Sequence, residues 1–339
     1  MIFLDITESL FQSINVSSHL EFDHEKVYYY EDSDLGFKSI IAIHSSIAGP
    51  AIGGCRYRDY ASYAEGLTDV LRLSRGMTEK NNAANLPFGG GKAIIFGDTP
   101  KSDDSLKAFA NFLNRVNGAY YSAEDIGMSL KDIQYIGNFS SYVFDNVDPG
   151  PYTAKGIFYS IEAALKFYLN KTLDSSEVSI QGAGSVGLTL ARYLADAGAT
   201  VYIQDIDTLK ISSINHKNIV PVSNAITQKC DLLAPCAIGG ILNADSIIGL
   251  SCSIIAGGAN NQLQDLDVDA KLHAMGIRYV PDVLINSGGV IGLTKDILGR
   301  DAAQIELELK LVAQRATEFM AIGHKNQMSI LAAMNGLSS

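Results

Sequence analysis

Apolar residues along the first part of the chain follow two kinds of pattern, one typical of strands and one typical of helices. Residues 26–30 and 38–44 are rich in β-branched and aromatic side chains, and they predict two early strands. Between residues 67 and 77 the apolar positions recur every three or four residues, which predicts an amphipathic helix. Ser102, followed by two aspartates, is a signal for the start of another helix, and a short strand is expected at 120–125. This alternation indicates an α/β domain.

A second α/β pattern begins in the middle of the chain. A strand at 178–181 leads through a glycine run into a helix, and the next strand is expected at 200–204. Before it, the segment 145–151 (DNVDPGP) is acidic and contains two prolines, as hinges between domains often do. The sequence therefore predicts two domains, residues 1–147 and residues 148–312.

Composition narrows the class of partner. The 339 residues carry a formal net charge of -11, which argues against nucleic acid or an anionic membrane surface as a partner. The four cysteines have no metal-ligand spacing, so no metal site is predicted. The first ten residues include acidic side chains and no basic segment, which argues against a signal peptide and favours a cytoplasmic protein with free thiols. A small molecule is the expected partner.

Residues 76–98 place two lysines on either side of a glycine cluster. Lys80 lies near the end of the predicted helix, and Lys92 follows the triplet Gly89–Gly91, where the backbone can turn or approach a ligand closely. Two ammonium groups around such a turn indicate an anionic ligand, with one lysine available for proton transfer. A glycine turn with two solvated lysines is the alternative. A phosphate-binding P-loop is excluded, because Leu86 stands where its first glycine should be.

The glycine run of the second pattern matches a dinucleotide-binding fingerprint. Gly182, Gly184 and Gly187 form GxGxxG between a strand and a helix, which places a pyrophosphate at the helix N-terminus. Asp205 ends the next strand 23 residues after Gly182, near the spacing of an acid that bonds the adenosine ribose. This acid favours NAD over NADP, although a turn residue is the alternative. Asn260 could bond a nicotinamide amide or hold a turn.

Seven segments, in the order in which they follow one another, carry a family resemblance: GPAIGG (49–54), LRLSRGMTEKNNAANLPFGGGKAII (71–95), SAEDIG (122–127), QGAGSVG (181–187), APCAIGGILN (234–243), IIAGGANNQL (254–263) and PDVLINSGG (281–289). The chain resembles the Glu/Leu/Phe/Val amino-acid dehydrogenases, most closely the leucine, phenylalanine, valine and tryptophan dehydrogenases. The resemblance implies an N-terminal α/β substrate and oligomerisation domain, a Rossmann NAD-binding domain, a cleft between them, C-terminal helices at 313–339 that return to the first domain, and a homo-oligomer.

The resemblance also implies a reaction, the reversible NAD-dependent oxidative deamination of an L-amino acid to its 2-oxo acid and ammonia. Lys92 would be the general base, acting through a water, and Asp125 would transfer protons at the substrate amine. Lys80 would bind the substrate α-carboxylate. Its helpers would be Gly53, Gly54 and Asn286. The cofactor-binding residues would be Gly182, Gly184, Ser185, Val186, Gly187, Asp205, Cys236, Ala237, Asn260 and Thr153.

The pocket for the substrate side chain would, by position in the family, be apolar. A glutamate side chain would leave its carboxylate unpaired there, so a branched-chain or aromatic amino acid is expected. Ordinary core packing is the alternative for each residue of this pocket. Its residues would be Ile52, Ala123, Val290 and Leu293, with Phe88 nearby.

A few positions depart from the family pattern. Glu79 replaces a tyrosine before the carboxylate-binding lysine, and the segment before Pro151 is shorter than in leucine dehydrogenases. Ser287 stands where alanine is usual, and Gly292 where asparagine is usual. Glu79 and the shortened segment suggest an alternative function, a catalytically silent regulator that binds NAD or an amino acid.

Overall fold

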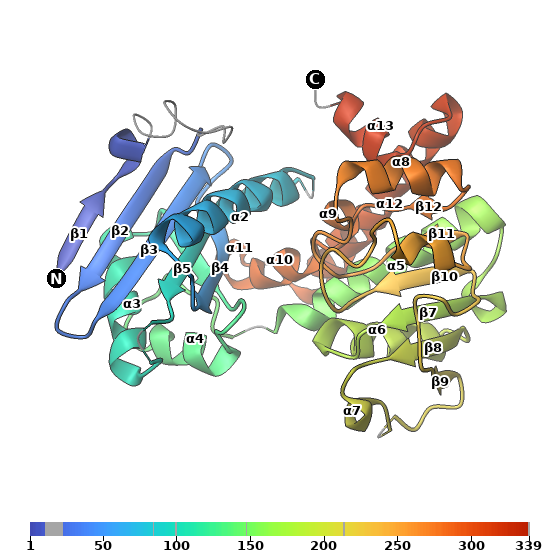
Figure 1. Cartoon of the computed structure of the whole chain (residues 1–339), viewed down its shortest axis with the longest axis horizontal. Coiled ribbons are helices and arrows are strands. Elements are labelled where there is room, and N and C mark those ends of the chain that lie inside the picture. The colour runs from blue at the N-terminus through green and yellow to red at the C-terminus, as the bar shows by residue number, and fades with distance from the viewer. Residues whose placement is uncertain (11–22, 84, 99, 147, 213, 338–339) are drawn as a thin grey trace. The chain divides into compact units, whose positions relative to one another are not determined.

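The computed structural model describes residues 1–10, 23–83, 85–98, 100–146, 148–212 and 214–337. They form two compact units, 1–147 and 148–339, each with its own sheet and core (Figure 1). Each unit combines a six-stranded sheet with helices, which confirms the predicted two-domain α/β fold. Among the described residues, no helix is both long and apolar enough to cross a membrane.

The first unit is built on a mixed sheet with the strand order β1-β2-β3-β5-β4-β6. The pairs from β1 to β5 are antiparallel, whereas β5, β4 and β6 run parallel to one another. The two early strands predicted from the sequence are β2 and β3. The strands are β1 (Ile2–Asp5), β2 (Lys26–Asp32), β3 (Phe37–Ser45), β4 (Ala51–Arg58), β5 (Gly89–Phe96) and β6 (Tyr120–Ala123).

Helices cover both faces of this sheet because its central strands bury side chains on both sides. In β3, Ile40 and Ala42 pack on the face covered by α2, while Ile41 and Ile43 pack on the face covered by α3 and α4. Ser102 starts α3 with a capping box, as the sequence predicted. The helices are α2 (Tyr63–Ala83), α3 (Asp103–Val116) and α4 (Leu130–Gly137).

The second unit holds an all-parallel sheet with the order β12-β11-β10-β7-β8-β9. Numbered from β7 along the chain, this is the 3-2-1-4-5-6 order of a Rossmann sheet. The order reverses between β7 and β10, where such folds bind their ligands. The strands are β7 (Glu177–Gln181), β8 (Thr200–Gln204), β9 (Ile219–Pro221), β10 (Leu232–Pro235), β11 (Ile254–Ile255) and β12 (Arg278–Tyr279).

Helices also cover both faces of the second sheet. Val178 and Leu232 of the sheet share one core with residues of α5, α6, α12 and α13, while Leu233 packs with α8 on the other face. The predicted return of residues 313–339 to the first domain stays a prediction. The helical segments are α5 (Pro149–Leu169), η1 (Leu173–Ser175), α6 (Ser185–Asp196), α7 (Thr208–Ser212), η2 (Ser246–Gly249), α8 (Leu266–Ala274), α9 (Asp282–Ile285), α10 (Gly288–Leu293), α11 (Lys295–Leu298), α12 (Ala302–Asn326) and α13 (Ile330–Leu337).

The helix α5 begins at Pro149, inside the segment that the sequence assigned to a hinge. The Asp148 side chain caps it by accepting the N–H of Gly150 at 2.8 Å. Pro149 takes the first helical position, where a missing N–H costs little because it would have no partner within the helix. The last three residues of the segment that looked like a linker are therefore a helix start.

Candidate active site

Lys92 and Asp125 lie side by side in the first unit. Lys92 belongs to β5 and Asp125 follows β6, and the Lys92 Nζ lies 2.5 Å from the Asp125 Oδ2. Their side chains are 9% and 20% exposed. Burial raises the pKa of Asp125, but the charges of Lys92 and Arg56 lower it by more, so this pKa lies below its ordinary value. The pair therefore joins a carboxylate to an amine that can carry or release a proton.

Two glycines of β4 let this pair lie against the backbone. A Cβ at Gly54 would lie 2.8 Å from the Asp125 Cβ and 3.2 Å from the Lys92 Nζ, and a Cβ at Gly53 would lie 1.9 Å from the carbonyl oxygen of Gly91. A side chain at either position would displace its neighbours. The structure thus brings four predicted site residues together at one place: Lys92, Asp125, Gly53 and Gly54.

The triple glycine before Lys92 is not a turn, and that part of the sequence interpretation was wrong. All three glycines belong to β5, and none has a positive φ. Close packing is the reason that they lack side chains. A Cβ at Gly89 would lie 1.9 Å from the carbonyl oxygen of Ser45, and a Cβ at Gly90 would lie 2.1 Å from the backbone nitrogen of Thr78.

Lys80 lies in the last turn of α2 and is partly exposed, while the neighbouring Glu79 is exposed to solvent. Two contacts hold this end of the helix against the sheet. The Asn81 Nδ2 donates to the carbonyl oxygen of Gly89 at 2.7 Å, and the Thr78 Oγ1 lies 2.9 Å from the Nδ1 of His44. The backbone that carries Lys80 is therefore fixed relative to the strand that carries Lys92.

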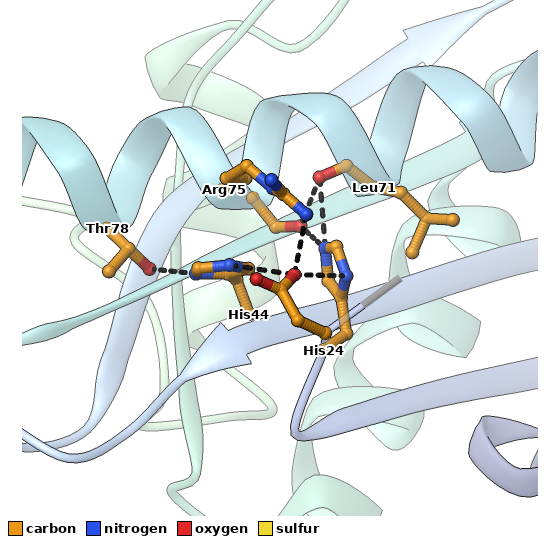
Figure 2. A network of polar contacts seen from close by, with 7 residues as sticks. His24, His44, Leu71, Arg75 and Thr78 are labelled. Carbon is orange, nitrogen blue, oxygen red and sulfur yellow. Dashed lines mark hydrogen bonds and ion pairs between the residues drawn. The ribbon is translucent and has the colours of Figure 1, made fainter. Parts of the chain in front are cut away.

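A polar network on the same helix reaches back to the segment before β2 (Figure 2). The Asp23 Oδ1 accepts a hydrogen bond from Arg75 at 2.7 Å and lies 3.2 Å from the Nε2 of His44. The His24 ring is buried 5.0 Å from the His44 ring, and its Nε2 lies 3.0 Å from the carbonyl oxygen of Leu71. The network ties α2 to this segment at two of its turns.

Arg56 contacts the Lys92–Asp125 pair, and the sequence interpretation missed it. Its Nε lies 3.3 Å from the Asp125 Oδ2, and its Nη1 lies 2.8 Å from Asp69 of α2. The signal was its position two residues after Gly54 in a strand, because such residues point to the same face of a sheet.

The glycine loop of the second unit fits a dinucleotide. Gly182 has φ of +104°, which favours glycine, and a Cβ at Gly187 would lie 2.0 Å from the carbonyl oxygen of Gly182. At Gly184, no described atom lies within 4 Å of where a Cβ would be. This open position is also the N-cap of α6, so the first-turn amides of the helix can face a pyrophosphate.

Asp205 follows β8 as an ionised acid beside this loop. Its Oδ2 accepts the N–H of Ala183 at 2.6 Å, and its Oδ1 accepts the N–H of Asp207 at 2.9 Å. These two hydrogen bonds hold the pKa of Asp205 below its ordinary value, and the one from Ala183 has the larger effect. A carboxylate has further lone pairs, so it can also accept hydroxyls of a ribose.

The other predicted cofactor residues surround the loop or the start of α5. A Cβ at Gly182 would lie 2.8 Å from the Ala237 Cβ, and one at Gly187 would lie 3.2 Å from the Cys236 Cβ. The Ser185 Oγ lies 3.4 Å from Asp148. The last two of these residues each pack against a glycine. The Val186 side chain lies over Gly258, and the Thr153 side chain lies over Gly289.

The remaining predicted residues of the second unit lie around α9 and α10. The Asn286 Nδ2 donates to the Asn260 Oδ1 at 2.8 Å, and the Asn286 Oδ1 is buried without a partner among the described residues. Val290 and Leu293 are buried in α10. Gly292 is glycine for a packing reason, because a Cβ there would lie 2.3 Å from the ring of Tyr152.

The predicted pocket residues of the first unit are buried apolar side chains. Ile52 is paired with Tyr121 of β6 and Gly90 of β5, and Ala123 is paired with Gly54. Phe88, just before β5, is also buried. The contacts of these three side chains within the first unit are compatible both with ordinary core packing and with the wall of a pocket.

Two family models match the chain. Residues 24–142 match the dimerisation domain of Glu/Leu/Phe/Val dehydrogenases, and residues 202–321 match the Glutamate/Leucine/Phenylalanine/Valine dehydrogenase model. The first match spans the Lys92–Asp125 pair and the second spans Asp205.

Similar proteins of known activity extend over most of the chain. A leucine dehydrogenase of Bacillus subtilis is 36% identical over 83% of this chain and 81% of its own length. An L-tryptophan dehydrogenase of Nostoc punctiforme is 37% identical over 83% and 82%, and a phenylalanine dehydrogenase of Caldalkalibacillus thermarum is 34% identical over 92% and 90%.

Solved structures have the same fold. The crystal structure of the L-tryptophan dehydrogenase from Nostoc punctiforme matches with a TM-score of 0.80 and 32% identity, over 97% of this chain and 96% of that one. A hetero-hexameric glutamate dehydrogenase from Thermus thermophilus matches with a TM-score of 0.74 over 96% and 91%, and at 17% identity it supports the fold alone.

Proposed function

We propose that this chain, which belongs to the Glu/Leu/Phe/Val dehydrogenase family, catalyses the reversible oxidative deamination of an apolar L-amino acid. As an amino-acid dehydrogenase it is an oxidoreductase that acts on a CH–NH2 donor, and NAD is its cofactor. The observation that carries the proposal is the Lys92–Asp125 pair, with 2.5 Å between Nζ and Oδ2, beside the bare backbone of Gly54.

The residues of the second unit would hold the cofactor. NAD, when bound, accepts the hydride that leaves the substrate Cα. The amides at the start of α6 and the open Gly184 position would bind its pyrophosphate, and the Asp205 carboxylate would accept the adenosine ribose hydroxyls. Asn260 would lie near the nicotinamide, oriented by its hydrogen bond from Asn286.

The residues of the first unit would perform the acid–base steps. Loss of hydride from Cα leaves an iminium ion, and water must then add to that carbon. Lys92 would take a proton from this water, and Asp125, in contact with the same ammonium group, would pass protons to and from the substrate nitrogen. Lys80 would pair with the substrate carboxylate, a role that needs a fixed cation near the reacting carbon.

The predicted side-chain pocket supports an apolar substrate. Ile52, Ala123, Val290 and Leu293 bring no charge or hydrogen-bonding group that could pair with a substrate carboxylate. Desolvating that carboxylate without a partner would cost several kcal/mol, which disfavours glutamate. Leucine, valine, phenylalanine and tryptophan are the candidate substrates.

We also propose that the protein is a homo-oligomer and that its ligands are small molecules, the substrate and the cofactor. The match of residues 24–142 to a dimerisation domain supports this assembly. Light scattering on the purified protein measures its mass directly, and a mass of a single chain at micromolar concentration would contradict it.

Substitution of the proposed base tests the function. Lys92→Ala should abolish the formation of NADH from the best amino-acid substrate, while NAD binding by titration calorimetry stays within about twofold of wild type, because the cofactor site lies in the other unit. Lys38→Ala is the matched control, since Lys38 is an exposed lysine in the neighbouring strand β3. It should leave turnover unchanged.

The substrate class is tested on a panel of leucine, valine, phenylalanine, tryptophan and glutamate, with the matching 2-oxo acids plus ammonia and NADH for the reverse reaction. An apolar member should be turned over fastest. Retained turnover in Lys92→Ala would disprove the assigned base. A wild-type protein that binds NAD but oxidises none of the panel would be the silent regulator instead.

A further inference from the structure

We propose that Arg56 is a positioning residue of this reaction, which keeps Asp125 charged and in place while Lys92 gives up its proton. The inference rests on the proposed function, in which Lys92 is the base and Asp125 relays protons. It assigns a role to a side chain that the sequence interpretation left without one.

The contacts on Asp125 lead to this assignment. The Arg56 Nε lies 3.3 Å from the Asp125 Oδ2, the same oxygen that lies 2.5 Å from the Lys92 Nζ. The three side chains are 12%, 20% and 9% exposed, so water screens their charges only in part. One carboxylate oxygen is therefore shared by two cations of different chemistry.

The far side of the guanidinium is held by α2. The Arg56 Nη1 lies 2.8 Å from the Asp69 Oδ2, and the Tyr60 hydroxyl donates to the same oxygen at 2.8 Å. The Asp69 side chain is 11% exposed. Because the guanidinium is planar and its donors form a rigid fork, an anchor on one side fixes the Nε that points to Asp125.

The chemistry of the base step explains why a second cation is useful. A general base must be neutral when it accepts a proton. If Lys92 were the only partner of Asp125, neutral Lys92 would leave a largely buried carboxylate without a counter-ion, which is costly. Arg56 stays charged at every working pH, so Asp125 keeps a counter-ion through the whole cycle.

Other titratable groups near the pair do not supply this effect. Burial raises the pKa of the Cys55 thiol and of the Tyr120 hydroxyl well above their ordinary values, so both stay neutral over the working range. Asp69 is already engaged by Arg56 and Tyr60. The charges that face Asp125 from β5 and β4 are therefore Lys92 and Arg56.

The pH profile of kcat/KM for amino-acid oxidation is the decisive measurement, made with the best substrate of the panel. Arg56→Gln should lower kcat by about tenfold or more and move the acid limb of the profile to higher pH by on the order of one pH unit, because a neutral base would then leave the Asp125 carboxylate without a counter-ion. Arg56→Lys keeps a charge but not the fork, so its limb should return toward wild type while kcat stays reduced.

Arg72→Gln is the matched control. Arg72 lies 3.8 Å from the same Asp69, but its side chain is 72% exposed and its charge is screened by solvent, so its profile should be that of wild type. An unshifted acid limb in Arg56→Gln, or a limb in Arg56→Lys that moves as far as in Arg56→Gln, would overturn the inference. If Arg56→Gln does not fold, an acid limb displaced by a full unit in Arg56→Lys overturns it as well.

The two proposals fail in different ways. Wild-type protein without amino-acid turnover, or turnover retained in Lys92→Ala, would defeat the proposed function whatever Arg56 does. An active wild type, an inactive Lys92→Ala and an Arg56→Gln variant with an unchanged profile would defeat only the role of Arg56.

Discussion

Lowering the pH from 7 to 5 should destabilise the first unit through His24. The His24 ring is 7% exposed, and its Nε2 lies 3.0 Å from the carbonyl oxygen of Leu71 and 2.9 Å from the Ser74 Oγ. A carbonyl oxygen only accepts, so the Nε2 carries a hydrogen. Burial first, and the nearby His44 and Arg75, lower the pKa of His24 from 6.5 to about 4.

The sign and size of the effect follow from this lowered pKa. In the unfolded chain His24 takes up a proton as the pH falls below 6.5, whereas in the folded chain it does so only near a pH of 4. The unfolded state therefore binds more protons between these values, and the free energy of unfolding falls as the pH drops through that window. The loss is about 2 kcal/mol between pH 7 and pH 5, and it approaches about 3 kcal/mol near pH 4.

Urea denaturation followed by far-ultraviolet circular dichroism measures this loss, since the chain has no tryptophan to report by fluorescence. His24→Gln is the comparison, because the glutamine amide can donate to the Leu71 carbonyl oxygen but does not titrate. Wild type should lose about 2 kcal/mol more than His24→Gln between pH 7 and pH 5. Equal losses in the two proteins would refute the reasoning, since Asp23 and the other acids titrate in both.

Two further predictions concern the nucleotide loop of the second unit, and the first of them has its control in the first unit. Gly187→Ala should lower both the thermal midpoint of the protein and its affinity for NAD, because the new Cβ would lie 2.0 Å from the Gly182 carbonyl oxygen. Gly76→Ala, at an open position inside α2, should instead raise the free energy of unfolding by about 1 kcal/mol. Scanning calorimetry that ranks the two variants the other way would contradict the packing argument. Asp205→Asn should weaken NAD binding about tenfold or more in calorimetric titration, because the hydrogen bonds from the ribose to a charged acceptor are lost. It should also reduce the ratio of the affinity for NAD to the affinity for NADP. An unchanged affinity for NAD would indicate that Asp205 is a turn residue only.

The parts of the fold that could be predicted are those set by short-range patterns. The strand before Gly182, the helix after it and the acid at Asp205 are adjacent in sequence, and together they identify the Rossmann unit that the strand order confirms. The start of α3 was equally readable, because Ser102 and Ser105 complete a capping box within three residues. The end of the predicted hinge segment is a helix start instead, because a proline can open a helix as well as break one.

The parts that could not be predicted depend on contacts between distant residues. The triple glycine looked like a turn because glycine permits unusual backbone angles, but its cause is the approach of Ser45, Thr78 and other groups far away in sequence. The Arg56–Asp125 contact joins residues 69 positions apart, and nothing in the local sequence gives their distance. The hydrophobic pattern of the sequence identifies a strand and its two faces. Which residue of the neighbouring strand lies beside a given residue depends on the register of the folded sheet.

The helix α2 connects these distant contacts into one support for the proposed chemistry. Its apolar side packs Val70 and Leu71 on the sheet, which fixes the helix axis. Asp69 on one turn then holds Arg56 beside Asp125, and Thr78, more than two turns later, touches both His44 and the Gly90 backbone next to Lys92. Because a helix is stiff over that length, the support for the acid, the base and Lys80 is set by one rigid element. A shift of α2 would therefore change all three groups together, which is why Asp69 and Thr78 are expected to affect catalysis without touching the substrate.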